Sequence, residues 1–188
     1  MRKLVLFMHV SLDGFVGGPN GELNWFHVDD EMFDYTEGLV DECDLGLYGR
    51  VTFEMMEHYW PTAADKPNAT KHDIEHSRWY KQVPKVVLSN SMQGMDLKNV
   101  TILSKDIPDE ITTLKKQKGK NIVIFGSPRA SYSLMNYNLI DDYWLFINPV
   151  IFGEGIPMFK DIKKRINLTF VESKTFTSGV VALHYRKK

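Results

Sequence analysis

The fold of this chain is decided by residues 44–56, which read Asp44-Leu45-Gly46-Leu47-Tyr48-Gly49-Arg50-Val51-Thr52-Phe53-Glu54-Met55-Met56. The segment begins as a short apolar run, breaks at Gly49 and resumes with the helical spacing of Phe53 and Met56. It therefore predicts a strand that turns at a glycine into a helix. The first N–H groups of such a helix have no carbonyl partners, and the helix dipole favours negative charge there, so the corner suits an anion.

Side chains at this corner also fit an anion. Arg50 offers a forked donor suited to phosphate, and Thr52 adds a hydroxyl within the first turn. We therefore predict that the corner from Gly49 to Thr52 binds a phosphate of a nucleotide. The alternative is an ordinary capped joint between a strand and a helix.

A second corner of the same kind follows residues 122–125, Ile-Val-Ile-Phe, which predict a central parallel strand. Gly126 permits close approach of a ligand, Ser127 is a suitable N-cap, and Pro128 fits the first helical position. The helix is expected to reach about Tyr137. Two such corners in one sheet indicate a dinucleotide lying across the carboxyl ends of parallel strands.

Composition limits the remaining possibilities. With 188 residues, 43% hydrophobic and 25% charged, the chain suits one domain spanning 1–188. A net charge of -1 favours neither nucleic acid nor an anionic membrane as a partner. The single cysteine, Cys43, excludes an internal disulfide and is expected as a buried thiol at the end of a helix. No stretch reaches transmembrane length, so we expect a cytoplasmic protein.

The other elements are predicted from hydrophobic periodicity and from helix start and stop signals. The polar segment 61–78 is expected to be a surface excursion with a short helix near its end. We predict an α/β fold with about eight strands and about four helices on both faces of a mostly parallel sheet, ending in an antiparallel hairpin. Strands are expected at 4–10, 45–48, 85–89, 100–103, 122–125, 142–152, 168–176 and 179–186, and helices at 29–43, 50–59, 108–118 and 128–137.

Polar residues after the first strand are further candidates. Asp13 precedes Gly14 and a glycine-rich loop that ends near Trp25, and such loops often carry function. The G-x-G-x-x-G dinucleotide fingerprint is absent here, which disfavours an ordinary Rossmann unit. In the next helix, Asp29, Asp30 and Glu31 fill the first turn. One of them could act as an acid in a pocket; the alternative is that all three stabilise the helix start.

Residues 72–76, His-Asp-Ile-Glu-His, match the H-x-x-E-H signature of zinc proteases. True sites place this motif on a buried helix with a third ligand elsewhere, and this segment is polar. We therefore predict no metal.

In their order and spacing, five short stretches resemble the dihydrofolate reductase-like fold, and specifically the reductase domain of the riboflavin-pathway deaminase-reductases, the RibD C-terminal family. They are Ser11-Leu12-Asp13-Gly14, Gly49-Arg50-Val51-Thr52-Phe53-Glu54, Lys85-Val86-Val87-Leu88-Ser89, Phe125-Gly126-Ser127 and Phe152-Gly153-Glu154-Gly155. The resemblance implies a stand-alone reductase domain, because the cysteines of the deaminase half are absent. Relatives are commonly dimers, so it also implies a homodimer.

The resemblance implies NADPH as the cofactor and assigns residues to it. Gly49, Arg50 and Thr52 would hold one phosphate region; Gly126, Ser127 and Arg129 would face the pyrophosphate. The adenosine end would lie by Ser89, Asn90 and Ser91, and this turn has no carboxylate to repel a 2′-phosphate. The loops with Gly14 and Trp25, and with Gly153 and Gly155, resemble the mobile segments that close over the substrate.

Catalytic residues are less defined. Asp13 is the candidate for orienting the substrate or handling a proton; the alternative is a turn aspartate bonded to its own backbone. The pterin-protonating carboxylate of dihydrofolate reductases could correspond to Asp29 or Asp30. The expected activity is hydride transfer to a 5-amino-6-(5-phosphoribosylamino)uracil-type substrate. The alternatives are reduction of dihydrofolate or another pteridine, and a non-catalytic nucleotide-binding module.

Overall fold

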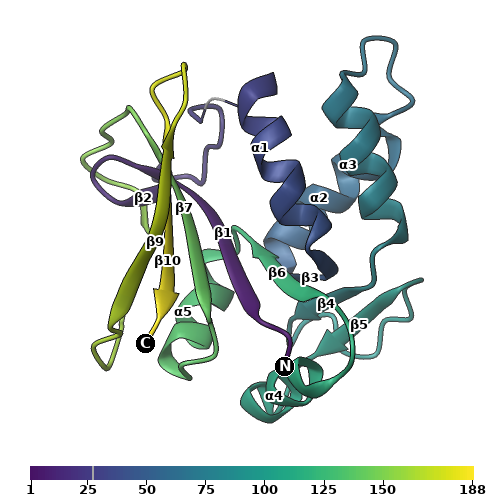
Figure 1. Ribbon diagram of the computed structural model, residues 1–188. Helices are drawn as coiled ribbons and strands as arrows, with labels where there is room; N and C mark the ends of the chain where they lie inside the picture. The colour runs from purple at the N-terminus through teal and green to yellow at the C-terminus, as the bar shows by residue number, and fades with distance from the viewer. Residues whose placement is uncertain (27) are drawn as a thin grey trace.

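An eight-stranded sheet forms the centre of the computed structural model, which describes residues 1–26 and 28–188. In space its strands follow the order β5-β4-β3-β6-β1-β7-β10-β9 (Figure 1). Their bounds are β1 (Leu4–Ser11), β3 (Cys43–Gly49), β4 (Lys85–Leu88), β5 (Val100–Leu103), β6 (Asn121–Phe125), β7 (Asp142–Asn148), β9 (Leu168–Thr175) and β10 (Val181–Lys187). Neighbours from β5 to β7 are parallel, and β10 is antiparallel to both β7 and β9. The predicted mostly parallel sheet with an antiparallel C-terminal hairpin is confirmed.

Helices cover both faces of this sheet, as predicted. Ile111 and Leu134 bring two of them into one hydrophobic cluster, and Val40, Phe53 and Tyr80 bring the other three into a second cluster on the opposite face. The first pair is α4 (Ile107–Lys116) and α5 (Pro128–Asn136); the other three are α1 (Asp30–Asp41), α2 (Arg50–Ala63) and α3 (Lys71–Gln82). The described residues thus form five helices where about four were expected.

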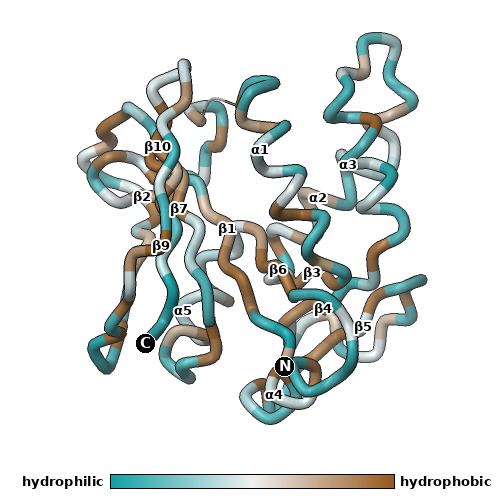
Figure 2. Tube along the Cα trace, in the orientation of Figure 1, coloured by the Kyte–Doolittle hydropathy of each residue, from teal (hydrophilic) through white to brown (hydrophobic). Residues whose placement is uncertain are grey.

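Strand β1 shows why both faces are covered. Leu4, Leu6 and Met8 belong to the cluster with α4 and α5, whereas Val5 and Phe7 pack on the side of α1. Successive side chains of a strand point to opposite faces, so a continuous apolar run is buried on both. The hydrophobic colouring of β1, β3 and β6 in Figure 2 has the same cause.

The segment 61–78 is more helical than predicted. Helix α2 continues through Pro61 to Ala63, and α3 is a full helix of 12 residues. A capping box starts α3: the Thr70 hydroxyl accepts the Asp73 N–H at 3.1 Å, and the Asp73 carboxylate accepts the Thr70 N–H at 2.9 Å. Tyr80 then anchors α3 as a fully buried side chain. Good capping and one large anchor offset the low apolar content of this segment.

The prediction that Cys43 ends a helix is wrong. Cys43 starts β3, opposite Asn121 of β6, and this pairing takes it out of α1, which ends at Asp41. The thiol is buried as expected, and burial raises its pKa to about 12.

Asp29 is the N-cap of α1, with its carboxylate accepting the Met32 N–H at 2.9 Å. Among the described residues, none of the helices has the length and apolar character needed to cross a membrane.

A small second sheet joins two loops beside the main one. It pairs β2 (Phe15–Gly17) with β8 (Ile156–Pro157) in antiparallel fashion. Gly155 precedes β8 with φ +156, and a Cβ there would clash with the carbonyl oxygen of Gly17. The close approach of the two strands therefore requires glycine at this position.

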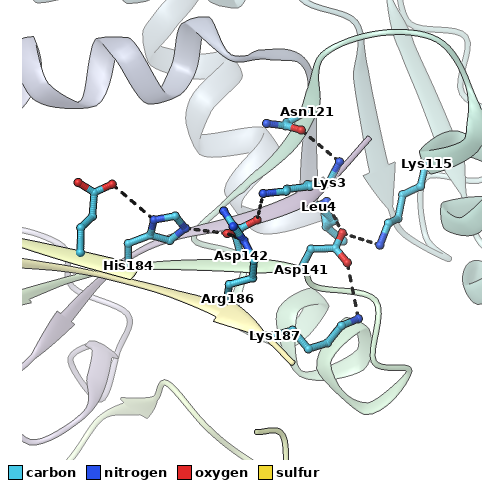
Figure 3. Close-up of polar contacts among 10 residues, drawn as sticks. Lys3, Leu4, Lys115, Asn121, Asp141, Asp142, His184, Arg186 and Lys187 are labelled. Atoms are coloured by element: carbon cyan, nitrogen blue, oxygen red, sulfur yellow. Dashed lines mark hydrogen bonds and ion pairs between the residues drawn. The ribbon is translucent and has the colours of Figure 1, made fainter. Parts of the chain in front are cut away.

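A charged network fastens the amino ends of β1 and β7 (Figure 3). Asp142 is buried and accepts hydrogen bonds from His184 at 2.7 Å and Arg186 at 2.9 Å, and Lys3 lies 3.0 Å away. Asp141, beside it, accepts the Leu4 N–H at 2.8 Å. In parallel strands the amino ends lie together at one edge of the sheet and the carboxyl ends at the other. This network therefore stabilises the edge opposite the predicted nucleotide corners.

Candidate functional site

The two glycine-marked corners lie side by side. Strands β3 and β6 are neighbours, and the Gly49 N–H donates to the Ser127 hydroxyl at 2.9 Å. A Cβ at Gly49 would lie 3.5 Å from that of Ala130, so the two helix starts nearly touch. One molecule can therefore contact both corners.

Ser127 occupies the predicted N-cap position without making the predicted capping bond. Its backbone is left-handed, with φ 55, and its hydroxyl donates to the Phe125 carbonyl at 3.0 Å while accepting from Gly49. The hydroxyl therefore joins the two corners. Gly126, with φ +51, has only a Thr52 methyl, 3.9 Å away, near the place of a Cβ, so its backbone is approachable.

The helices at these corners start differently from the other three. Neither α2 nor α5 has an acidic residue in its first turn or a side-chain cap. By contrast, α1, α3 and α4 all carry carboxylates in the first turn. The first-turn N–H groups of α2 and α5 thus receive no negative charge from their own helices, although the dipole favours it there.

The predicted basic residues lie at the surface of these corners. Arg50 is ion-paired with Glu54 one turn along α2, at 3.0 Å, and both side chains are about half exposed. Arg129, in the first turn of α5, is exposed. Because exposed pairs of this kind are weak, a phosphate could take the Arg50 guanidinium from Glu54 at little cost.

Ser89, Asn90 and Ser91 follow β4, on the far side of β3 from β6. The Ser89 hydroxyl accepts the Met92 N–H at 3.2 Å and lies 3.3 Å from the Ser91 hydroxyl. Since β4, β3 and β6 are parallel, this turn and the two corners lie along one edge of the sheet. The structure thus aligns all three predicted cofactor segments.

An apolar chamber of about 220 Å³ adjoins the corners. Thr52 and Gly126 line it, together with residues of β1, α1, α2 and α3 and with Val16, Leu23, Phe26 and Val28. No lysine, arginine, aspartate or glutamate is among the described residues that line it. Its aromatic lining consists of Phe7, Phe26, Phe33, Trp60 and Phe125.

Three histidines also line the apolar chamber, and burial lowers the pKa of each. The pKa falls to about 4 for His9 and His72 and to about 3 for His76. His72 stacks on Phe33 with ring centroids 3.3 Å apart, and His76 packs against Trp60 at 4.2 Å. The three imidazoles are therefore neutral at physiological pH and behave as polar aromatic rings.

The tautomer of His9 follows from its neighbours. The Asn148 amide group near it also contacts the Phe146 carbonyl at 2.9 Å, so that group must be the NH₂ rather than the oxygen. The same NH₂ lies 3.3 Å from His9 Nδ1, which consequently accepts. The neutral ring then carries its proton on Nε2.

Asp30 lies in a separate acidic cleft of about 210 Å³ between α1 and α3. This acidic cleft shares Phe33, Thr36, His72 and other lining residues with the apolar chamber. Its carboxylates are Asp30, Asp34, Glu37, Asp41 and Glu75. Lys71, its lysine, is paired with Asp34 at 3.2 Å and Glu75 at 3.9 Å.

Asp13 links two loops and is not among the residues that line the apolar chamber. Its carboxylate accepts the N–H groups of Phe152 at 3.1 Å and Gly153 at 2.7 Å, and the Ser11 hydroxyl at 2.7 Å. Loss of hydration acts to raise its pKa, but the hydrogen bonds from Gly153, Ser11 and Phe152 hold that pKa below its ordinary value. The backbone N–H of Asp13 itself also helps to lower this pKa, so the carboxylate combines the local turn bond considered from sequence with the contacts to Phe152 and Gly153.

The other predicted loop residues support the same junction. Gly14 has φ +90, and its carbonyl accepts the Met158 N–H at 2.7 Å. Trp25 packs edge-on against Phe152 with ring centroids 5.1 Å apart. The loops carrying Gly14 and Trp25 and those carrying Gly153 and Gly155 are thus in contact beside the apolar chamber.

Sequence reasoning missed the chamber residues His9, His72 and His76 as a group. His9 was readable as a polar interruption of an apolar strand. His72 and His76 were considered only as part of a zinc-protease signature, which was set aside, but their i, i+4 spacing also places them on one face of α3. In the part of the chain that the structure describes, no group of three potential metal ligands is found.

Comparisons with known proteins agree with this geometry. The chain is 37% identical over 186 residues to the Bacillus subtilis (strain 168) protein YyaP, covering 98% of this chain and 94% of that one. A putative riboflavin biosynthesis protein from Shewanella sp. PV-4 has the same fold, with a TM-score of 0.74, 21% identity and 99% coverage of both chains. A dihydrofolate reductase from Enterococcus faecalis, solved with NADP(H), matches with a TM-score of 0.64 and 19% identity over 99% of this chain and 96% of that one.

The model of the RibD C-terminal domain matches residues 2–182, nearly the whole chain. This match agrees with the sheet order, the paired corners and the fold shared with the solved structures. The chain therefore belongs to the RibD C-terminal domain family.

Proposed function

We propose that this protein is an NADPH-dependent reductase that transfers hydride to a small heterocycle. One observation carries the proposal. Two neighbouring helix starts, each without acidic residues or caps of its own, adjoin an aromatic chamber through Thr52 and Gly126. Such a pair suits a diphosphate at the corners and a flat ring in the chamber.

The chain's own residues supply binding and exclusion of water. The N–H groups of α2 and α5, with Arg50 and Arg129, would hold the diphosphate. Ser89, Asn90 and Ser91 would face the adenosine end, where neutral groups tolerate a 2′-phosphate. When bound, the nicotinamide supplies the hydride. The aromatic walls would keep water from the reacting carbon.

Family membership supports an aminopyrimidine of the 5-amino-6-(5-phosphoribosylamino)uracil type as the substrate class. The apolar chamber is consistent with a flat ring of this kind. Dihydrofolate is the comparison substrate, because a dihydrofolate reductase shares the fold. Oxidation of NADPH by each compound, followed by absorbance, separates the two.

Titration of the purified protein with NADPH and NADH tests the cofactor. We expect NADPH to bind more tightly, and Arg50→Gln and Arg129→Gln to weaken it by about tenfold each, since each loses a charged phosphate contact. Arg165→Gln, a change of an exposed arginine outside the corners, is the matched control. Absence of binding by either nucleotide at millimolar concentration would refute the proposal.

A further inference from the structure

The apolar chamber and the acidic cleft meet at α1, and together they restrict the charge of a substrate. Residues of β1, α1, α2 and α3 line the chamber, and the cleft opens between α1 and α3. We propose that the substrate carries no phosphate and is a neutral or cationic flat heterocycle held in the apolar chamber. This inference rests on the proposed reductase function, but it replaces the phosphorylated aminopyrimidine that family membership supports with a phosphate-free heterocycle.

The chamber's described lining offers no cation to a phosphate. Its only titratable side chains are His9, His72 and His76, and burial keeps all three neutral at physiological pH. A dianion placed there would lose its hydration without gaining an ion pair, which is strongly unfavourable.

Helix α1, which borders both hollows, repels an anion as well. It carries no lysine or arginine and five carboxylates, which are those of Asp30, Glu31, Asp34, Glu37 and Asp41. Three described lysines reach α1: Lys71 pairs with Asp34 at 3.2 Å, Lys174 pairs with Glu31 at 3.3 Å, and Lys120 donates to the Asp41 carbonyl at 2.6 Å. They are outnumbered by the five carboxylates of the helix. A phosphate group of a bound substrate that extends from the chamber toward α1 would therefore meet net negative charge.

The lining suits a flat ring. Phe26 stacks on His9 with centroids 4.7 Å apart, and Phe33 stacks on His72, so aromatic rings stand on two sides of the chamber. Its volume of about 220 Å³ is also below the roughly 300–1,000 Å³ of pockets for drug-sized ligands. A single ring system fits this space better than a ring joined to a ribose phosphate.

The test is calorimetric titration of the full chain saturated with NADP⁺, which prevents turnover. The probes are two matched pairs: the aminopyrimidine riboside with its 5′-phosphate, and riboflavin with FMN. We expect a phosphate-free member to bind at least about tenfold more tightly than its phosphorylated partner.

Equal or tighter binding of the phosphorylated members overturns the inference, and so does failure of both phosphate-free probes to bind while NADP⁺ binds. In either case the reductase proposal stands. Failure of NADP⁺ itself to bind would instead remove the reductase proposal, and the inference with it.

Charge reversal in the acidic cleft provides a second test. Glu37→Lys should reduce the preference for the phosphate-free members by about threefold or more, with Glu37→Gln between it and the native protein. Glu110→Lys makes the same charge change on α4, on the opposite face of the sheet, and should leave the preference unaltered. A Glu37→Lys protein with an unaltered preference contradicts the inference.

Discussion

The Ser127 hydroxyl accepts the Gly49 N–H at 2.9 Å, and this bond joins the starts of two helices that are 78 residues apart in the chain. The bond connects β3 to β6 at the level where the sheet ends. The Ser127 side chain therefore adds to the pairing of β3 with β6 in fixing the relative position of the two corners.

Two substitutions of Ser127 separate the contribution of this hydrogen bond to stability from the contribution of the left-handed backbone. Ser127→Ala should destabilise the protein by about 1–2 kcal/mol, because it leaves the Gly49 N–H without its partner and keeps the left-handed backbone. Ser127→Gly loses the same bond but relieves a strain of roughly 1 kcal/mol at φ 55. Urea unfolding should rank Ser127→Gly above Ser127→Ala, and the reverse order would contradict this account.

Asp13→Asn tests whether this carboxylate acts as a tether or handles a proton. If the carboxylate only holds Phe152 and Gly153 in place, the substitution should lower turnover by less than about tenfold. Limited proteolysis of the 149–157 loop should then become faster. A proton-handling role would instead lower turnover by about 10²–10⁴-fold with little change in proteolysis. NADPH affinity should be retained in both cases.

The buried histidines predict a loss of stability in mild acid. The unfolded chain protonates His76 below its ordinary pKa of 6.5, whereas the folded protein resists protonation until about pH 3. Since the unfolded state binds more protons, the free energy of unfolding falls as pH decreases from 6.5. At pH 5 this amounts to about 2 kcal/mol for His76.

His76→Phe should flatten this dependence, because phenylalanine keeps the ring contacts with Trp60 and Trp79 and does not titrate. Urea unfolding at pH 7.5 and pH 5 measures the effect. His58→Gln, at an exposed position, is the control. An equal acid loss in His76→Phe and the native chain would rule out His76 as the source.

Asp142→Asn should destabilise the protein by about 2 kcal/mol at neutral pH, since it removes a charged partner from His184, Lys3 and Arg186. Burial acts to raise the Asp142 pKa, but its contacts with His184, Lys3 and Arg186 hold it below 3.8. This stabilisation is therefore complete above pH 3.8 and is lost as pH falls through the lower folded value. Thermal unfolding at pH 7, with Asp96→Asn as an exposed control, should show the difference.

The predicted homodimer has a candidate edge. Strand β9 ends the sheet, and Phe170 and Val171 on it are 54% and 39% exposed. Exposed apolar side chains on an edge strand favour pairing with a second copy. Light scattering should show a dimer that Phe170→Glu converts to monomer without loss of thermal stability. A native chain that is monomeric at high micromolar concentration would exclude this dimer.

Much of the fold was readable because local signals agreed with the tertiary structure. Residues 44–56 and 122–130 each combine an apolar run, a glycine and a helical pattern, and both became strand–corner–helix units as predicted. In β1, burial on both faces gave the apolar run from Leu4 to Val10, which is interrupted at His9.

What could not be read depends on contacts between distant residues. The position of Cys43 was set by its pairing with Asn121, and the extent of α3 by caps and by burial of Tyr80. His9 and His76 are 67 positions apart, and only the folding of α3 over the sheet brings both to the apolar chamber. Phe152 and Gly153, which donate to Asp13, lie about 140 residues along the chain from it.

The small sheet of β2 and β8 reinforces the contact between Asp13 and the loop that carries Phe152 and Gly153. Phe15 pairs with Pro157 there, Gly155 fits closely against Gly17, and Asp13 holds Phe152 and Gly153 nearby. The two segments are thus connected at several points, so neither can move away from the site without breaking these contacts. Any opening of this reductase-like site on that side would require both segments to move together.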